Sequence, residues 1–174
     1  KDNGDIVFAG SVSGGLWKSE NNGSTWAFVS GFSENVGISS MCQTNNGTIY
    51  IGTGHFQENS TEDGAGSGYS GNGIYYTSDG GGSFTHLAGT ESFDNVNEVV
   101  AKENTIFIAS SNGLFQYNAS LTQVLAGDIL SLAIAEDGSV LICSDVDGET
   151  YISTDGGSTF NGISGNAPDQ IPSD

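Results

Sequence analysis

One eight-residue pattern occurs three times along the chain, and it constrains the fold more than any other feature. The copies read SENNGSTW from Ser19, TSDGGGSF from Thr77 and STDGGSTF from Ser153. Each copy has Ser or Thr first, Asn or Asp third, Gly fifth and an aromatic residue last. Similar octets at widely separated positions predict one structural unit that is repeated along the chain.

Polar turns that open onto strand-like runs form a second repeated feature. Four of them read DNGDIVFAG from Asp2, TNNGTIYIG from Thr44, KENTIFIAS from Lys102 and EDGSVLICS from Glu136. A turn that ends in Gly or Asn before β-branched and aromatic residues is typical of a hairpin. Further apolar runs precede the last three turns and begin at Ile38, Val96 and Ile129. We therefore expect the first unit to lack its innermost strand.

The spacing of the units indicates their architecture. The third strand-like runs end at Ser19, Thr77, Tyr117 and Ser153, which are 58, 40 and 36 residues apart. The first interval contains an insert of 18 residues, 55–72, and without it this interval is also 40. Four strands in about 40 residues is the size of a β-propeller blade. The sequence therefore predicts an all-β propeller segment of about four four-stranded blades, with a solenoid or a β-sandwich as the alternative. The expected blades are approximately 1–31, 38–89, 96–126 and 129–164, followed by a linker or tail, 165–174.

The octet resembles the Asp-box repeat, S/T-x-D-x-G-x-T/S-W/F, of BNR-repeat propellers such as xyloglucanases, sortilin-type receptors and secreted bacterial BNR proteins. The matching residues are Ser19, Asn21, Gly23 and Trp26 in the first copy, Thr77, Asp79, Gly81 and Phe84 in the second, and Ser153, Asp155, Gly157 and Phe160 in the third. Asn21 replaces the acid, and the third unit has YNASLTQV in place of the octet. The resemblance implies box hairpins between third and fourth strands, on the face opposite the ligand site.

The octet also has a physical explanation as a turn. A carboxylate or amide two residues into a turn accepts hydrogen bonds from the N–H groups of that turn, and glycine supplies the positive φ that the reversal needs. The aromatic residue then packs between blades. We therefore interpret Asp79 and Asp155 as structural residues rather than as catalytic or calcium-binding ones.

The charge of the chain limits its partners. It has 21 acidic residues, three lysines and no arginine, for a formal net charge of −18. Such a surface repels phosphate, so nucleic acid and anionic membranes are poor partners. The longest apolar stretch, 124–135, is interrupted by Gly127 and Asp128 and is too short to span a bilayer. Sialidases also carry Asp-box repeats, and they bind the carboxylate of sialic acid with a cluster of arginines. Because this chain has no arginine, the resemblance does not extend to sialidase activity.

The cysteines, His86 and one acidic segment offer few matches to known site patterns. Cys42 and Cys143 lie in apolar runs without metal-site spacing and are predicted to be buried thiols, with a disulfide as the alternative. His86 has no partner motif and is expected to lie at the surface. The segment SDVDGET offers the acids Asp145, Asp147 and Glu149. Their oxygen ligands suit calcium, and an ordinary acidic turn is the alternative; no other cofactor is expected.

The insert is the best candidate for a binding site. It carries His55, Phe56, Glu58, Asp63 and Tyr69 on a glycine-containing loop. In a propeller, this connection lies on the face opposite the octet turns. Long loops are often functional, and a mobile acidic loop is the alternative. The net charge favours a neutral glycan, a cationic protein surface or a calcium-bridged partner.

These features favour a non-catalytic recognition or scaffold module of a secreted or cell-surface bacterial protein, with a protein or a neutral glycan as its partner. The alternative is a fragment of a xyloglucanase-like glycoside hydrolase, which needs two carboxylates beside a cleft. The segment 165–174 contains two prolines and few apolar residues, so it is a poor substitute for the absent innermost strand. We expect the rest of a longer chain, or another subunit, to complete the propeller.

Overall fold

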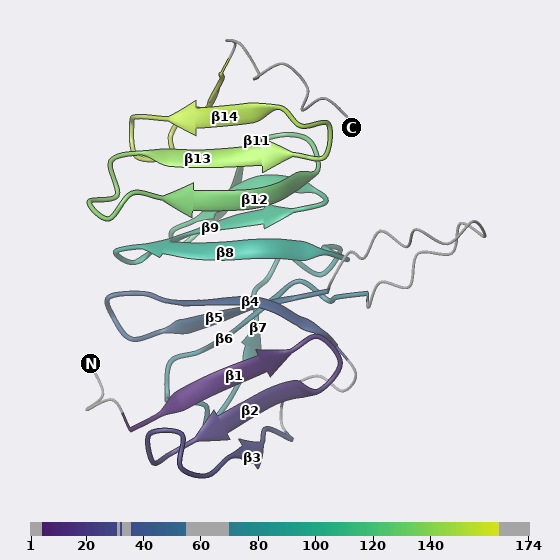
Figure 1. The fold of residues 1–174 in the computed structure, drawn as a ribbon, viewed down its shortest axis with the longest axis vertical. Helices are drawn as coiled ribbons and strands as arrows, with labels where there is room; N and C mark the ends of the chain where they lie inside the picture. The colour runs from purple at the N-terminus through teal and green to yellow at the C-terminus, as the bar shows by residue number, and fades with distance from the viewer. Residues whose placement is uncertain (1–4, 31, 33–35, 55–69, 164–174) are drawn as a thin grey trace, which may run out of the picture.

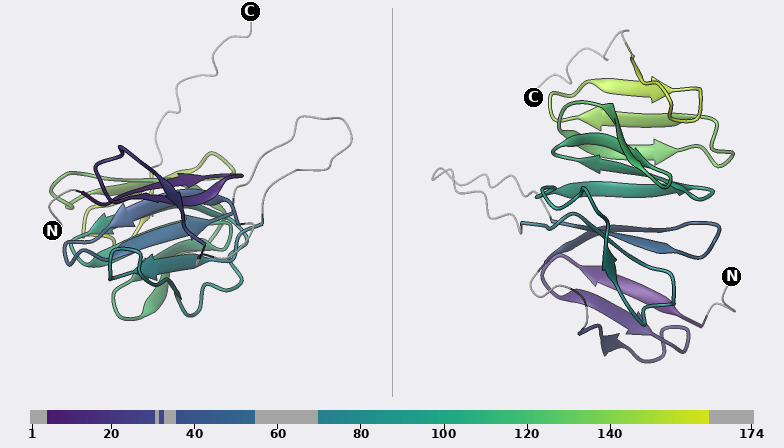
Figure 2. Two further views of the ribbon diagram at one scale, coloured as in Figure 1. Left: turned by 90° about the horizontal axis from the view of Figure 1, so that it is seen from below. Right: turned by 180° about the vertical axis from the view of Figure 1, so that it is seen from behind.

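The computed structural model describes residues 5–30, 32, 36–54 and 70–163 (Figure 1). All regular structure in this part of the chain is β, in four antiparallel sheets. The sheets follow one another in chain order along the longest axis of the molecule (Figure 1), and the two further views in Figure 2 show the same stack. We call them blades 1 to 4. No helix in the described part of the chain is long and apolar enough to cross a bilayer.

The strands of each blade are consecutive in the sequence. Blade 1 contains β1 (Val7–Ser11), β2 (Gly15–Ser19) and β3 (Ala27–Phe28). Blade 2 contains β4 (Ile38–Gln43), β5 (Ile49–Thr53), β6 (Ile74–Thr77) and β7 (Thr85–His86). Blade 3 contains β8 (Val96–Lys102), β9 (Thr105–Ser110), β10 (Gly113–Tyr117) and β11 (Leu121–Leu125). Blade 4 contains β12 (Ile129–Ile134), β13 (Leu141–Asp145), β14 (Thr150–Ser153) and β15 (Asn161–Gly162). Each blade lies within one of the predicted ranges.

Strand pairing identifies the strand that blade 1 lacks. Val7 of β1 pairs with Ser19 of β2, as Ile49 of β5 pairs with Thr77 of β6. β1 is therefore a second strand, equivalent to β5, β9 and β13. The sheet order β1-β2-β3 has no strand inside β1, whereas the other three blades have four strands. For the described residues, this confirms that the first unit lacks its innermost strand.

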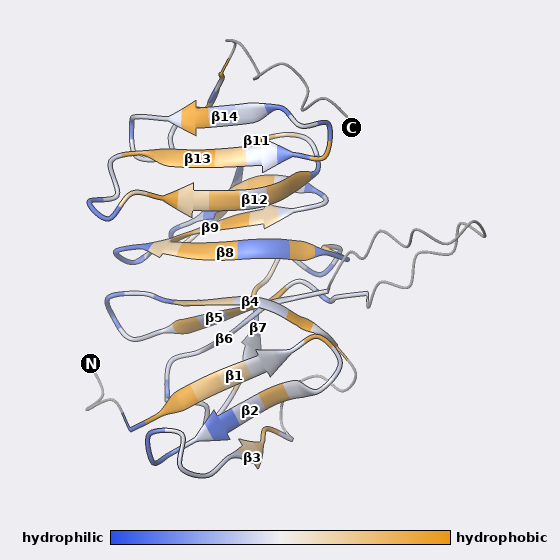
Figure 3. Ribbon diagram, in the orientation of Figure 1, coloured by the Kyte–Doolittle hydropathy of each residue, from blue (hydrophilic) through white to orange (hydrophobic). Residues whose placement is uncertain are grey.

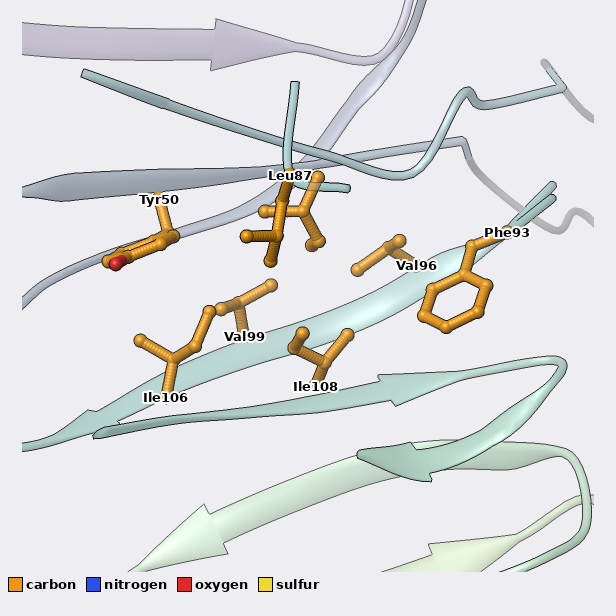
Figure 4. Packing of buried hydrophobic residues seen from close by; sticks show 8 residues of the cluster. Tyr50, Leu87, Phe93, Val96, Val99, Ile106 and Ile108 are labelled. Carbon is orange, nitrogen blue, oxygen red and sulfur yellow. The ribbon is translucent and has the colours of Figure 1, made fainter. Parts of the chain in front are cut away.

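Alternate residues of a second strand face the two neighbouring blades. Ile51 of β5 belongs to the core between blades 1 and 2, with Leu16 and Ile38. Tyr50, the next residue in the chain, belongs to the core between blades 2 and 3. Figure 4 shows Tyr50 and Leu87 facing Ile106, Ile108 and Val99 of blade 3 across this core. Both faces of β5 are therefore apolar because each covers a neighbouring blade.

Apolar residues concentrate on the strands and polar residues on the turns, as Figure 3 shows. Both cysteines lie on strands and are free thiols. Cys143 is buried as predicted, but Cys42 is only half-buried, because it lies near the end of an innermost strand with no further strand inside it. Desolvation by burial raises the pKa of Cys42 to about 12 and that of Cys143 to about 11, so both thiols stay protonated at neutral pH.

Candidate functional site

The third octet forms a turn closed by its acid. Asp155 Oδ1 accepts hydrogen bonds from the backbone N–H groups of Ser158 and Thr159, both at 3.0 Å, and from Ser153 Oγ at 2.8 Å. Thr159 Oγ1 donates to Asp155 Oδ2 at 2.6 Å. Ser153 Oγ in turn accepts from the N–H of Gly157 at 2.8 Å. The acid and the first hydroxyl of the octet together bind the backbone of the turn.

The other two octets repeat this arrangement. Asp79 Oδ1 accepts from the N–H groups of Gly82 and Ser83, and Ser83 Oγ donates to Asp79 Oδ2. In the first octet, Asn21 Oδ1 accepts from the N–H of Thr25 at 2.8 Å. Its amide Nδ2 donates to Thr25 Oγ1 at 2.8 Å, whereas the equivalent hydroxyls in the other octets, Ser83 and Thr159, donate to the acid. Asparagine therefore replaces the acid, and the direction of this one hydrogen bond is reversed.

Hydrogen bonding fixes the protonation state of both octet acids. Hydrogen bonds from the hydroxyl and backbone of Thr159, and then from Ser153, hold the pKa of Asp155 well below its usual range. Ser83 and Thr77 act in the same way on the pKa of Asp79. A carboxylate that stays ionised and has its oxygens engaged in this way is poorly suited to act as a general acid.

The glycines of the second and third octets lie against aromatic rings of the preceding blade. A Cβ at Gly157, where φ is +93°, would clash with the ring of Phe107, which is 0% exposed. A Cβ at Gly81 would lie 2.6 Å from the ring of Phe8, which also stacks edge-to-face on Phe84 with centroids 6.4 Å apart. The octet therefore packs against its neighbouring blade as well as closing its own hairpin.

The aromatic residues that end the octets differ in burial. Phe84 and Phe160 pack against the cores between blades, as expected. Trp26 is 41% exposed, so the expectation that it packs between blades is wrong for the described residues. Phe84 stacks on a ring of the blade before its own, and none of the described residues forms a blade before blade 1.

The acidic segment after β13 is a hydrogen-bonded turn. Asp145 Oδ1 accepts from the N–H groups of Asp147 and Glu149, at 3.1 and 2.9 Å, and Tyr151 Oη donates to Asp145 Oδ2 at 3.1 Å. Among the described residues, no group of three His, Cys, Asp or Glu side chains is placed to hold a metal ion. The calcium hypothesis for Asp145, Asp147 and Glu149 gains no support from this geometry and stays a prediction.

Hydrogen bonds hold the backbone at both ends of the insert. The predicted binding residues His55, Phe56, Glu58, Asp63 and Tyr69 lie outside the described residues. We call Thr53, Gly54 and residues 70–73 the insert root. Thr53, which is 0% exposed, donates from Oγ1 to the carbonyl oxygen of Gly73 at 2.7 Å and accepts from the N–H of Asn72 at 2.8 Å. The N–H groups of Gly54 and Gly71 donate to the carbonyl oxygens of Gly37 and Asp94.

Close packing makes the insert root intolerant of side chains. Gly54 has φ of +88°, and a Cβ there would clash with the carbonyl oxygen of Asp94. The backbone at both ends of the insert therefore packs closely on Asp94, which lies in the loop that joins blades 2 and 3. Because residues 70–73 of the insert root precede β6 and the octet turn follows it, the insert root and the octet turn lie at opposite ends of β6 (Figure 1).

His86 contacts the insert root, which the sequence did not indicate. Its Nε2 hydrogen-bonds the carbonyl oxygen of Asn72, and its ring stacks on Tyr75 with centroids 4.7 Å apart. Its Nδ1 lies 3.7 Å from Glu91 Oε1. The sequence predicted only a surface position for His86, and in the structure it is half-buried with these contacts. The pairing of Tyr75 with His86 across β6 and β7 brings these side chains together, and this register is known only from the structure.

Asp128 is a second residue that sequence reasoning missed. It precedes β12, and its carbonyl oxygen accepts from the N–H of Val146 at 2.9 Å, so it lies at the same end of the blades as the insert root. Its Oδ1 is buried without a hydrogen-bond partner among the described residues. Desolvation by burial raises the pKa of Asp128, whereas the octet acids are shifted the other way.

Two shallow grooves lie away from the insert root. One, of about 570 Å³, runs between blade 1 and the octet turn of blade 2, beside Lys18, Phe28 and Phe84. The other, of about 390 Å³, lies at the turns before β9 and β13 and is lined by polar and charged side chains, among them Lys102, Glu136 and Asp137. Hydrogen bonds from Ser139 lower the pKa of Asp137, so this carboxylate is poorly suited to donate a proton.

Comparisons with known proteins agree with the architecture. A family model described as a two component regulator propeller matches residues 31–55. A GH74 enzyme from Niastella koreensis has a similar structure, with a TM-score of 0.66 and 22% identity, over 92% of this chain and 28% of that chain. The fold is that of a β-propeller. The strands described above therefore form part of such a propeller.

Two further solved structures are similar over nearly the whole segment. A GH74 xyloglucanase from Xanthomonas campestris is 16% identical, with a TM-score of 0.64, over 92% of this chain and 28% of that chain. The extracellular domain of a one component system from B. thetaiotaomicron is 19% identical, with a TM-score of 0.66, over 94% of this chain and 21% of that chain. No curated protein matches the sequence. The chain thus spans about a quarter of the length of these propellers.

Proposed function

We propose that this propeller segment is a non-catalytic recognition or scaffold module that binds a protein or a neutral glycan outside a bacterial cell or at its surface. The observation that carries the proposal is the insert root. The connection between second and third strands has 20 residues, 54–73, in blade 2, but only residues 12–14, 111–112 and 146–149 in the other blades. A long loop on a rigid frame is typical of a binding site.

Charge and surroundings support this choice of partner. The net charge of −18 disfavours anionic ligands. The described side chains beside the insert root include the ring of Tyr75, the imidazole of His86 and the amide of Asn72, which pack on or bond to one another. Aromatic rings with neighbouring amide groups suit a sugar or a polar protein surface. The similar extracellular domain from B. thetaiotaomicron agrees with an extracellular role.

The test replaces residues 55–69 by a short Gly-Ser linker and keeps the insert root intact. A binder is first identified with the intact chain on a glycan array and in a pull-down. We expect the shortened chain to lose this binding while its melting temperature stays within a few degrees, because surface loops tolerate length changes at small cost. The matched control inserts the same linker at 12–14 of blade 1 and should still bind. Unchanged affinity after the replacement would contradict the proposal.

Asp128 favours a second candidate function, a glycoside hydrolase related to the xyloglucanases. A general acid needs a raised pKa, and burial shifts Asp128 in that direction. The measurement is release of reducing sugar from xyloglucan and a β-glucan panel by the wild-type chain and by Asp128→Asn. Hydrolysis that this variant abolishes would establish the hydrolase and overturn the non-catalytic proposal.

A further inference from the structure

Asparagine is followed by glycine at several points in the chain, and these pairs differ in how the glycine amide is held. In the described residues, the asparagines of these pairs are Asn22, Asn46, Asn72, Asn112 and Asn161. Asparagine is a chemically labile residue. In such a pair the backbone nitrogen of glycine attacks the side-chain carbonyl carbon of asparagine, since glycine has no Cβ to hinder the approach. This attack requires a glycine N–H that is accessible to base and a backbone that can turn toward the side chain.

Turn hydrogen bonds hold the glycine amide in the first two pairs. The N–H of Gly23 donates to Ser19 Oγ at 2.8 Å within the first octet. The N–H of Gly47 donates to the carbonyl oxygen of Thr44 at 2.9 Å. The side chain of Asn46 is engaged as well, because its Oδ1 accepts from Thr44 Oγ1 at 2.7 Å. Both turns therefore oppose the attack.

Burial protects the third and fourth pairs. Gly73, in the insert root, and Gly113, at the start of β10, are both buried. The N–H of Gly73 donates to the carbonyl oxygen of Phe93 at 3.0 Å. The side chain of Gln123 lies against Gly113, and its Nε2 donates to the carbonyl oxygen of Asn112 at 3.0 Å. Water and base therefore have poor access to these two glycine amides.

The fifth pair lies on the two-residue strand β15, and its glycine amide faces solvent. Asn161 pairs with Ile152 of β14. The N–H of Ile163, two residues further along, donates to the carbonyl oxygen of Thr150 at 2.8 Å. Because successive N–H groups of a strand point to opposite sides, the N–H of Gly162 points away from β14. No described strand lies beyond β15, and Gly162 is exposed.

Blade 2 shows that this exposure is a property of the outer strand and remains when a further blade follows. Strand β7 has the same length as β15, and Thr85 occupies the position of Asn161. Thr85 pairs with Tyr76, which packs against the core between blades 2 and 3. Thr85 is nevertheless exposed. A blade packed against blade 4 would therefore leave Asn161 accessible at the outer rim.

We propose that Asn161 is a site of spontaneous deamidation, and that this modification removes the outer strand of blade 4. The nitrogen of Gly162 gives its proton to a base in water and bonds to Cγ of Asn161. The bond from Cγ to the side-chain nitrogen breaks, and this nitrogen leaves as ammonia after taking up a proton. Water then opens the cyclic imide at one of its two carbonyl groups, which leaves aspartate or isoaspartate, without any oxidation or reduction.

The modification changes both the backbone and the charge of blade 4. Isoaspartate carries its side-chain methylene in the main chain, so Gly162 loses its register with Tyr151. Because β15 has only two residues, little other pairing remains to hold it. Either product also adds a negative charge at the outer rim. This proposal is independent of what the insert binds.

The test follows deamidation of the 174-residue chain in mildly alkaline buffer, with and without urea. Peptide mapping by mass spectrometry gives the rate at each asparagine, and an isoaspartyl methyltransferase labels the isoaspartate. In the folded chain, we expect Asn161 to react at least roughly tenfold faster than each of the other four asparagines. In urea, where the turns and strands are lost, the five rates should agree within about threefold.

Two variants and one further measurement sharpen the test. Ser19→Ala removes the acceptor for the N–H of Gly23, so the rate at Asn22 should rise at least about threefold while that at Asn161 stays unchanged. Asn161→Gln is the matched control, because glutamine does not form the same imide. Hydrogen exchange at Ile163 should become at least roughly tenfold faster in the incubated wild-type chain, and it should not change in incubated Asn161→Gln.

Three results would overturn the proposal. The first is a rate at Asn161 in the folded chain that does not exceed the rates at the other four asparagines. The second is the same ratio of rates with and without urea, since local sequence would then set the rates and the fold would have no part. The third is complete deamidation of Asn161 with unchanged hydrogen exchange at Ile163, which would show that the outer strand survives.

Discussion

Blade 3 and blade 4 close their outer hairpins in different ways. Blade 4 uses an octet turn, after which the outer strand β15 has only two residues. Blade 3 has no octet, and its outer strand β11 has five residues with a bulge opposite β10. The octet blades 1 and 2 match blade 4, since β3 and β7 also have two residues. Long strand pairing and an octet turn are therefore alternative ways to hold the outer edge of a blade.

The two closures also meet the preceding blade differently. In blade 4, the ring of Phe107 packs on Gly157, where a side chain has no room. In blade 3, the equivalent ring is Tyr50, which packs on Tyr117 with centroids 6.2 Å apart. Tyr117 occupies the position of the first octet hydroxyl. Where the octet is lost, a ring-to-ring contact thus replaces a ring-to-backbone contact, and the blades remain packed.

The largest expected effect comes from adding a side chain at an octet glycine that packs on an aromatic ring of the preceding blade. Gly157→Ala combines a backbone strained at φ of +93° with a clash against buried Phe107. We expect a loss of about 2–5 kcal/mol in the free energy of unfolding, measured by urea denaturation. Gly47→Ala is the control, because Gly47 has φ of +88° but no atom within 4 Å of an added Cβ. It should cost only about 1–2 kcal/mol.

A double-mutant cycle separates the clash from the strain. Phe107→Leu shortens the ring that Gly157→Ala would meet, so the two losses should be less than additive, with a coupling of about 1 kcal/mol or more. Phe107→Leu with Gly47→Ala should be additive, since these residues share no contact. Additivity in both pairs would mean that the octet glycine acts through its backbone alone, and the comparison with blade 3 would fail.

Removing the octet acid should have the next largest effect. Asp155→Ala leaves the N–H groups of Ser158 and Thr159 without their acceptor, so the melting temperature should fall by several degrees. Asp155→Asn should lose less, because Asn21 shows that an amide oxygen accepts the same backbone N–H while its nitrogen donates to the threonine hydroxyl. Equal losses in the two variants would contradict this interpretation of the turn.

Acid should weaken the octet blades selectively. The pKa values of Asp79 and Asp155 are lower in the folded chain than their ordinary value of 3.8. Their contribution to stability is therefore complete above about pH 5 and is lost as the pH falls through 3.8 toward the folded pKa values. Asp79→Asn combined with Asp155→Asn cannot titrate there, so its urea midpoint should fall less steeply between about pH 5 and pH 2. Parallel pH profiles would contradict the shifted pKa values.

The sequence predicts the parts of this molecule that are local and repeated. The strand order, the blade period, the missing inner strand and the bonding of Asp79 and Asp155 within their own turns all depend on residues near one another in the chain. Because the units are repeated, the same strand and octet patterns occur several times in the sequence and support one another. The half-buried Cys42 departs from its prediction because its burial depends on what lies inside an innermost strand.

The candidate site was less predictable because it depends on register between strands. His86 meets Tyr75 and Asn72 only after β6 pairs with β7. Asp128 is half-buried with a fully buried Oδ1, and its own neighbours in sequence carry no motif. Trp26 matched an octet position but is exposed, because none of the described residues forms a blade before blade 1. Such properties depend on tertiary contacts between residues that are distant in the chain. No repeated sequence pattern indicates these contacts.

The smallest expected effect concerns the turn that replaces the octet in blade 3. Ala119 has φ of 62°, a left-handed conformation that costs about 1–2 kcal/mol for a residue with a Cβ. Ala119→Gly removes this strain but adds freedom to the unfolded chain, so the net gain in unfolding free energy should be only about 0.5–1 kcal/mol. Asn22 of the first octet, with φ of 58°, is the matched control. Asparagine adopts this conformation at lower cost, so Asn22→Gly should gain little or nothing. A loss of stability in Ala119→Gly would mean that the Ala119 methyl makes a contact worth more than the strain, and blade 3 would then depend on this turn as the other blades depend on their octets.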